Sequence, residues 1–333
     1  MTEFESIQRL TRPLGIRIPL ICGPMYPCSN PELVAAVSEA GGMGVVQPLS
    51  LTYVYGYEFR AGLRKIKSLT QKPFGMNALI EKSSKRYLDR MSAWIDCALE
   101  EGVRFFITSL GNPGWVVDRV HRSGGIVYHD ATERKWALKG VEAGVDGLIA
   151  VNNRAGGHAG KESLQYLYES LGDLNLPVVA AGGIGSESGF IEALRLGYSG
   201  VQMGTRFIAT TECQASQAYK QAILKATSDD IVLSERLTGI PVSVIRTPYV
   251  TRKGLHPGWL ARRLLKGNRS RHLIRLLYTV QSLWKLRQDF QKEKGEPEYW
   301  QAGKSVDDIH SVESASAIVK RLDDALQRAN RQS

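Results

Sequence analysis

Cysteine is scarce in this 333-residue sequence, which contains only four. They are scattered along the chain at Cys22, Cys28, Cys97 and Cys213. Because no C-x-x-C pair occurs, the pattern indicates neither a disulfide framework nor a zinc site, and no metal is expected. Cys22 and Cys28 are interpreted as small buried thiols of the core. A reduced compartment, the cytoplasm, is therefore the expected location.

Long apolar runs are also missing. No uninterrupted apolar stretch approaches the roughly 20 residues that a membrane-spanning helix needs, so no transmembrane segment is expected. The opening stretch, MTEFESIQRLTRPLG, contains acidic residues and lacks the apolar centre of a secretion signal. Both observations favour the cytoplasmic location.

Acidic residues are depleted in one segment. Between Thr251 and Gly295 there are twelve Lys or Arg and two Asp or Glu, and the difference, 12 − 2 = +10, equals the net charge of the whole chain. Apolar residues recur there at helical spacing, so we expect a basic helix whose apolar stripe packs on the rest of the protein or on a second copy in a homodimer. An acidic carrier protein or a membrane surface is the alternative partner. No nucleic-acid-binding module accompanies the charge, and nucleic acid is not expected as a ligand.

What the sequence does contain is a regular alternation of apolar runs and amphipathic stretches up to about Thr210. The runs read as strands are IPLICG, GVVQ, KPFGMN, RFFITS, GIVYHD, DGLIAV, PVVAAGG and GVQMGT. Eight such units predict an α/β fold, the TIM (β/α)8 barrel, with an additional C-terminal helical segment. An open doubly wound sheet is disfavoured, because the first turn reads GPMYPCSNPE and lacks the G-x-G-x-x-G fingerprint.

Two domains are expected. Residues 1–250 would form the barrel, with an irregular excursion after about residue 211, and residues 251–333 a basic helical extension that packs on it. The predicted helices end at glycines, which suit left-handed caps: Gly41, Gly102, Gly144 and Gly197. Asp130 or Thr132 is expected to cap the helix after the fifth strand.

Glycine turns follow the last two predicted strands. Gly182 and Gly183 end the seventh, and Gly204 and Thr205 follow the eighth. Barrels of this type often bind phosphate with the loops after strands seven and eight, where free N–H groups face the anion. We therefore predict a phosphate site at these two turns.

A third glycine-rich stretch, VNNRAGGHAG, follows the sixth strand and contains His158. The glycines beside the histidine allow the backbone to approach a ligand closely. Histidine accepts or donates a proton near neutral pH, since its ordinary pKa is about 6.5. His158 is therefore the candidate catalytic residue. The alternative is a histidine that only satisfies its own turn.

Four segments together resemble the nitronate monooxygenase family, also called 2-nitropropane dioxygenases. They are IPLICGPMYPCSNPELVAAVSEAGGMGVV, RAGGHAG, VVAAGGIG and GVQMGTRFIATTEC, in that order between about Ile18 and Thr247. A weaker match occurs at WQAGKSVDDI. The resemblance implies a TIM barrel that holds FMN. Its relatives include flavin-dependent enoyl carrier-protein reductases and NADH:quinone reductases.

The resemblance also implies roles for single residues. The backbone of Pro24 and Met25 would lie along the flavin ring, and Asn77 would hydrogen-bond the cofactor. The two glycine turns would hold its phosphate. His158 would face the substrate over the flavin, and His129 would line the same mouth.

One departure from the family pattern concerns the substrate. Many relatives have an acid four residues before the histidine and a glutamine three residues earlier, whereas this chain has Arg154 and Val151. Arg154 is either a solvated surface charge or a group that attracts an anionic substrate, because a guanidinium presents fixed donors to oxyanions.

The resemblance predicts an FMN-dependent oxidoreductase that converts nitronates or nitroalkanes, with oxygen, to carbonyl compounds. Two alternatives remain open. One is an NAD(P)H-dependent FMN reductase acting on a quinone or on an enoyl carrier-protein thioester. The other is a non-catalytic flavin-binding interaction protein.

Overall fold

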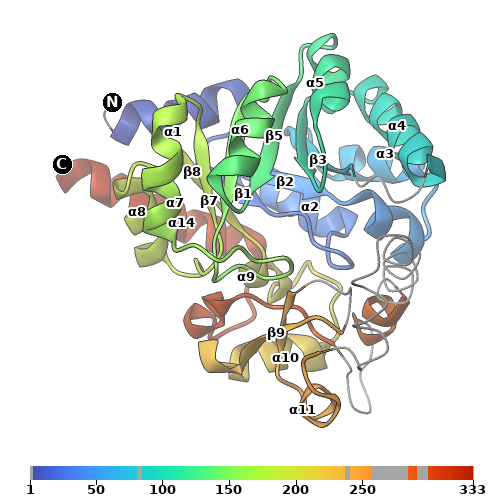
Figure 1. The fold of residues 1–333 in the computed structure, drawn as a ribbon, viewed down its shortest axis with the longest axis vertical. Helices are drawn as coiled ribbons and strands as arrows, with labels where there is room; N and C mark the ends of the chain where they lie inside the picture. Colours follow the sequence, from blue (N-terminus) through green and yellow to red (C-terminus); the bar gives the residue numbers. More distant parts are fainter. Residues whose placement is uncertain (1–2, 81–84, 237–240, 257–283, 291–298, 333) are drawn as a thin grey trace.

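Eight parallel strands close into a barrel in which β1 pairs with β8 (Figure 1). The structure is a computed structural model that describes residues 3–80, 85–236, 241–256, 284–290 and 299–332. The predicted TIM barrel is confirmed: each strand overlaps its predicted run, and β2, β3 and β5 extend one or two residues beyond theirs. The strands are β1 (Leu20–Cys22), β2 (Met43–Val46), β3 (Phe74–Leu79), β4 (Phe105–Ser109), β5 (Ile126–Ala131), β6 (Gly147–Val151), β7 (Val178–Ala181) and β8 (Gly200–Met203).

Helices surround the strands and form the outer layer. They are α1 (Glu3–Leu14), α2 (Pro31–Glu39), α3 (Phe59–Leu69), α4 (Lys85–Glu100), α5 (Gly114–His121), α6 (Arg134–Glu142), α7 (Leu164–Leu171), α8 (Glu187–Arg195) and the short α9 (Thr205–Ile208). The predicted glycine caps are confirmed, since Gly41, Gly102, Gly144 and Gly197 all have positive φ. The predicted cap of α6 is wrong. The N-cap is Glu133, because β5 continues through Asp130 to Ala131.

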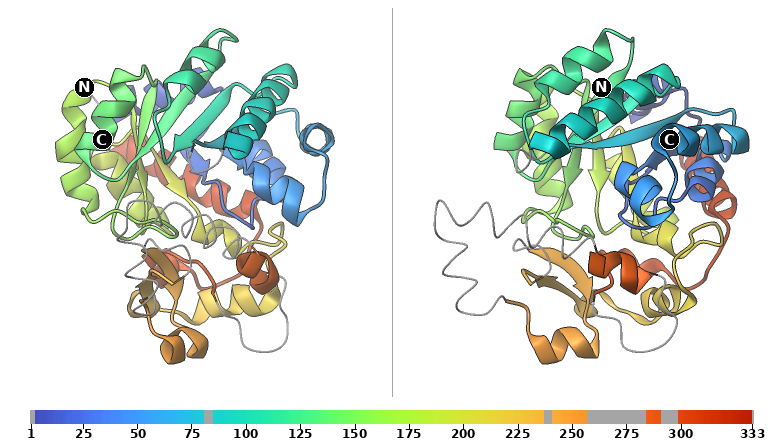
Figure 2. Two further views of the ribbon diagram at one scale, coloured as in Figure 1. Left: turned by 45° about the vertical axis from the view of Figure 1, so that its right-hand side comes forward. Right: turned by 90° about the vertical axis from the view of Figure 1, so that its right-hand side faces the viewer.

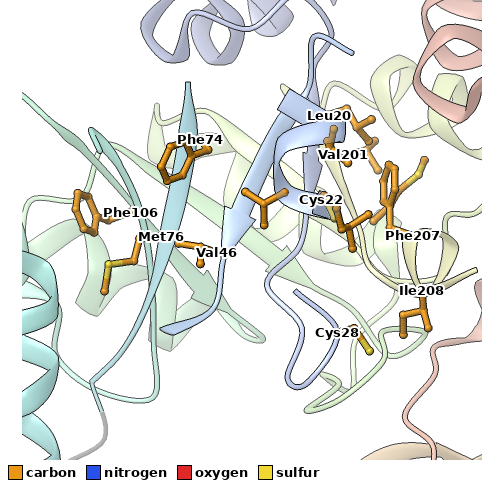
Figure 3. Close-up of a cluster of buried hydrophobic side chains, with 14 of the residues drawn as sticks. Leu20, Cys22, Cys28, Val46, Phe74, Met76, Phe106, Val201, Phe207 and Ile208 are labelled. Atoms are coloured by element: carbon orange, nitrogen blue, oxygen red, sulfur yellow. The ribbon is translucent and has the colours of Figure 1, made fainter. Parts of the chain in front are cut away.

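Side chains on alternate positions of each strand face either the helices or the barrel interior. The outward set packs under the helices, and Leu20, Cys22, Val46, Met76, Phe106 and Val201 belong to it (Figure 3). The inward set is a separate cluster that includes Ile21, Val45, Phe105, Ile107, Tyr128, Ile149 and Val179. This separation assigns a side to each strand residue.

Large inward side chains fit because glycines lie opposite them. A Cβ on Gly147 would lie 2.3 Å from the ring of Tyr128, and one on Gly75 would lie 2.6 Å from the ring of Phe105. The two rings meet edge to face with centroids 5.3 Å apart. The middle of the barrel is therefore filled by side chains.

Helix α1 closes the end of the barrel where the strands begin. Leu10, Leu14 and Ile16 join the inward cluster. A Cβ on Gly200 would lie 2.3 Å from a methyl carbon of Leu10, so the glycine makes room for this helix. The open end is the opposite one, where the strands stop.

The described elements that follow the barrel lie mainly against that open end (Figure 2). They include α10 (Gln217–Lys225), the hairpin of β9 (Ile231–Ser234) and β10 (Val242–Ile245), α11 (Pro248–Lys253), and the 3-10 helix η4 (Lys304–Asp308). The final helix α14 (Ala315–Gln332) runs back along the barrel and packs against α8 and α2. Most of the basic segment, 257–283 and 291–295, lies outside the described residues.

An arginine network joins α14 to the barrel. Arg206 of α9 is only 2% exposed. It donates a hydrogen bond of 2.7 Å to Glu313 and one of 3.0 Å to the carbonyl of Ser311. Glu313 also pairs with Arg321 of α14, which in turn pairs with Glu187. No described helix is long and apolar enough to cross a membrane.

Candidate active site

Polar side chains face inward at the open end of the barrel, above the aromatic filling. Three side-chain oxygens there are buried and have no hydrogen-bond partner among the described residues: Asn77 Oδ1, Asp130 Oδ1 and Gln202 Oε1. Each residue lies on the inward side of its strand, two positions beyond an inward Gly75, Tyr128 or Gly200. Buried polar groups are nearly always paired, so unpaired oxygens in one place indicate a ligand site.

The glycine turns predicted to hold phosphate lie at the same end. Gly182 and Gly183 have φ values of 115° and 73°, which side chains rarely adopt. Outside the strand ladders, the N–H groups of Gly183 and Gly204 donate to no acceptor among the described residues. Both turns therefore present free donors, as an anion site requires.

The loop after β1 touches the second of these turns. A Cβ on Gly204 would lie 3.4 Å from the sulfur of Met25, so the two loops are in contact. The backbone of Met25 is already satisfied, because its N–H donates to Ser29 Oγ at 2.9 Å and its carbonyl accepts from Ser50 Oγ at 3.2 Å. Pro24 and Met25 are half-buried. Both residues can contact a ligand through their surfaces. The backbone N–H of Met25 is already bonded and cannot donate a hydrogen bond to that ligand.

The loop that carries His158 is held against the first glycine turn. Asn152 is fully buried, and its side-chain amide donates 2.9 Å to the carbonyl of Gly182. On the other side of the loop, Ser243 of β10 donates 2.8 Å to the carbonyl of Gly157. His158 is an exposed residue, yet desolvation by the surrounding protein lowers the pKa of its imidazole below the ordinary value.

A strap from the C-terminal part, residues 299–309, crosses these loops. The N–H of Gly303 donates 2.9 Å to Thr205 Oγ1, and that of Lys304 donates 2.9 Å to the carbonyl of Arg154. A Cβ on Gly303 would lie 2.6 Å from the nitrogen of Gly156, so the contact requires a glycine. The weakly matching segment WQAGKSVDDI is thus the strap that braces the two predicted phosphate loops.

Arg154 lies over the glycine turn. Its side chain is 47% exposed, and its Nη2 is 3.6 Å from Asp307 Oδ2 in the strap. A Cβ on Gly183 would lie 2.6 Å from Arg154 Nε. The guanidinium therefore lies between Asp307 and Gly183, partly exposed to solvent. It stands beside the turn that was predicted to bind phosphate.

His129 lies on the helix side of β5, away from the barrel interior. Its Nδ1 is 2.9 Å from Thr108 Oγ1, and its ring lies against Gly140 of α6. Burial lowers its pKa to about 4, so the imidazole is neutral at physiological pH. The structure does not bring His129 to the inward side with Asn77, and its place at the substrate mouth stays a prediction.

The inward residue at the end of β5 is Asp130, which sequence reasoning considered only as a helix cap. Its sequence signal is the same as that of Gln202. Both are single polar residues on the inward alternation of an apolar strand, near the strand's carboxyl end. His129 and Asp130 line a cleft of about 780 Å³ at the ends of β4 and β5, together with Leu110, Gly111, Asn112 and Trp136.

These features fit a planar cofactor that ends in a phosphate. The unpaired oxygens of Asn77 and Gln202 belong to amides, which can both donate to and accept from the edge of a heteroaromatic ring. The free N–H groups of Gly183 and Gly204 suit a phosphate. The described residues contain no cluster of His, Cys, Asp or Glu that would hold a metal ion.

Comparison with known proteins gives a family match over nearly the whole chain. The profile described as "Nitronate monooxygenase" matches residues 8–324. The chain is also 30% identical over 285 residues to a probable nitronate monooxygenase of Staphylococcus saprophyticus, which covers 73% of this chain and 79% of that protein.

A second relative has a different name. The chain is 31% identical over 242 residues to the (3aS,4S,5R,7aS)-5-hydroxy-7a-methyl-1-oxo-octahydro-1H-indene-4-carboxyl-CoA dehydrogenase of Rhodococcus jostii. The match covers 72% of this chain and 66% of that protein, just under two thirds of its length.

Among solved structures, FabK from Thermotoga maritima superimposes with a TM-score of 0.78 and 26% sequence identity, covering 97% of each chain. The superposition therefore extends over the C-terminal part as well as the barrel.

Proposed function

The chain belongs to the nitronate monooxygenase family, a family of oxidoreductases, and we propose that it is an FMN-dependent enzyme that oxidises nitronates or nitroalkanes with oxygen to carbonyl compounds. The observation that supports this most is the meeting of three features at one barrel end. They are the free donors of two glycine turns, the unpaired amides of Asn77 and Gln202, and the loop that carries His158.

In this proposal Gly182, Gly183, Gly204 and Thr205 hold the phosphate of FMN. Thr205 Oγ1 already accepts from Gly303, so its hydroxyl hydrogen is left for the phosphate. Asn77 hydrogen-bonds the ring, and the half-buried Pro24 and Met25 lie along it. When bound, the flavin supplies the electron-accepting chemistry that no side chain here offers.

His158 contributes proton chemistry and orientation. A neutral nitroalkane must lose the proton on its α-carbon, and an imidazole with a lowered pKa is unprotonated at neutral pH and free to take it. A nitronate has already lost that proton, so for this substrate His158 holds the anion in place. Arg154 lies beside the phosphate turn and adds positive charge near the entrance.

The proposal is tested by mixing the purified, flavin-loaded protein anaerobically with a nitronate and, separately, with NAD(P)H. We expect the nitronate to bleach the flavin absorbance, and oxygen to restore it with release of a carbonyl compound. The released cofactor is identified by mass as FMN rather than FAD. A flavin that only NAD(P)H reduces would contradict the proposal.

A second candidate is supported by the dehydrogenase relative, whose name specifies a carboxyl-CoA substrate. Here the same barrel would transfer hydride equivalents between an acyl thioester and the flavin. The guanidinium of Arg154, which pairs with Asp307 beside the glycine turn, suits the phosphates of such a carrier. Reduction of the flavin by an acyl-CoA, but not by a nitronate, would favour this candidate. A flavin reduced by none of the three would favour a non-catalytic role.

A further inference from the structure

The carboxyl group of Asp130 has no role in the proposed oxidation. We propose that Asp130 is a second proton-carrying residue of this site, whose protonated carboxyl donates a hydrogen bond to an oxyanion of the bound substrate. The inference rests on the proposed function and deepens it, since it specifies a substrate that carries or develops an oxyanion.

The position of Asp130 follows from the alternation along β5. Tyr128, two residues earlier, has its ring in the barrel interior against Gly147, whereas His129 packs on α6. Asp130 therefore faces inward at the carboxyl end of the strand, where barrel enzymes bind their substrates. Its Oδ1 is inaccessible to solvent and has no hydrogen-bond partner among the described residues.

The loop of His158 returns to the same strand end. A Cβ on Gly160 would lie 3.4 Å from Thr132, two residues beyond Asp130, and 2.4 Å from the carbonyl of Val151. Gly160 is two residues beyond His158. The chain thus places the imidazole loop and the carboxyl on neighbouring strands at one mouth.

The protonation state of Asp130 depends on its surroundings. Desolvation raises the pKa of Asp130 to about 7, and among the described residues no cationic partner holds the carboxyl ionised. The charged side chains that line the nearby cleft are Lys139 and Glu142 of α6, which are opposite in sign. His129 on the same strand is neutral, and His158 is the titratable group of the next loop. Around neutral pH the carboxyl is therefore available in its protonated form.

The chemistry of a neutral nitroalkane needs both groups. The α-carbon–hydrogen bond breaks and its proton moves to a ring nitrogen of His158. The electron pair forms the carbon–nitrogen double bond, and the negative charge passes to the nitro oxygens. Asp130 donates its O–H to one of these oxygens and keeps its proton. A hydrogen bond to charge that develops in the transition state lowers the barrier.

An ionised Asp130 would instead repel an oxyanion, so binding of an anion is coupled to protonation of this carboxyl. The coupling provides a test that does not depend on turnover. Butyrate is a planar oxyanion of nitronate shape that does not reduce a flavin, and calorimetry on the flavin-loaded protein measures its dissociation constant between pH 6.5 and 9. For the wild type we expect the constant to rise about tenfold per pH unit above pH 7.

The test variant is Asp130→Asn, which keeps the shape and hydrogen-bonding capacity but cannot titrate. We expect it to bind butyrate with a constant that is independent of pH in this range. The matched control is Asp173→Asn, an exposed carboxylate paired with Arg134, which should retain the wild-type slope. A pH slope that persists in Asp130→Asn, or no binding of butyrate to the wild type at any pH, would overturn the inference.

Infrared spectroscopy of the wild type supplies a measurement that needs no variant to fold. We expect a protonated-carboxyl band at pH 6 that disappears as the pH rises through about 7 and shifts when butyrate binds. A protein with this band and this butyrate slope that fails to oxidise nitronates contradicts only the proposed function. A protein that oxidises nitronates but lacks both contradicts only the inference.

Discussion

At the scale of the residue, His158 and His129 lie in two different environments. His158 is open to solvent on a loop, and His129 is buried beside Thr108. For His158→Asn we expect turnover of a neutral nitroalkane to fall by about 100- to 10,000-fold, the usual worth of a general base. Oxidation of a preformed nitronate should fall less. The measurement is the steady-state rate on both substrate forms, with FMN content determined first, and equal rates in variant and wild type would assign His158 a structural role only.

His129 predicts a pH dependence of stability. Its folded pKa of about 4 lies below the ordinary 6.5, so the fold favours the neutral ring. This contribution is complete above about pH 6.5 and is lost as the pH falls to 4, by about 3 kcal/mol in total. His129→Asn should remove that loss, measured by urea unfolding at several pH values against the exposed control His310→Asn. Asp130 acts in the opposite sense, since its raised pKa reduces stability as the pH rises to about 7. If His129→Asn lost as much stability in acid as the wild type, His129 would not be the source of this pH dependence.

At the scale of the element, the turn after β7 depends on glycine. Gly183 has a φ of 73°, and a Cβ there would lie 2.7 Å from the Cβ of Arg154. Gly183→Val should strain the turn by about 1–3 kcal/mol and weaken FMN binding at least about tenfold while the barrel stays folded. Gly189→Ala in α8 is the matched control, because its new Cβ would meet its neighbours at an ordinary 3.5–3.6 Å. Circular dichroism and flavin content measure the two effects, and a Gly183→Val protein with stoichiometric FMN would place the phosphate elsewhere.

The strands and glycine turns could be predicted from sequence because their signals are local. Apolar runs and capping glycines mark each βα unit, and the turns Gly182–Gly183 and Gly204–Thr205 follow directly from them. The sides of β5 could not be assigned in this way, since His129 and Asp130 are adjacent polar residues. Only the fit of the Tyr128 ring against Gly147, a contact between two strands, determines which one faces inward.

At the scale of the whole molecule, the C-terminal part belongs to the site as well as to the exterior. Its strap bonds Thr205 and Arg154 through Gly303 and Lys304. No local pattern predicts such contacts, because they join residues about a hundred positions apart or more. Sequence reasoning therefore described residues 251–333 as a basic helical extension and missed the strap.

The network that fastens α14 makes a prediction at this scale. Arg206 is buried and paired with Glu313, and burial lowers its pKa, so removing it leaves Glu313 without its buried partner. We expect Arg206→Met to reduce the free energy of unfolding by about 3 kcal/mol. Arg321→Met removes a more exposed partner of the same carboxylate, and about 0–1 kcal/mol is expected. Denaturant unfolding compares the two, and equal losses would contradict a special role for the buried arginine.

The closure of one barrel end by α1 determines how ligands reach the site. With Leu10 seated against Gly200, one end is sealed, and molecules enter and leave by the other. Because side chains fill the middle of the barrel, a cofactor would bind at the open end, and a substrate bound over it would cover it. Product must therefore leave before the next substrate binds. An inert molecule bound at the open end would block both substrate binding and product release.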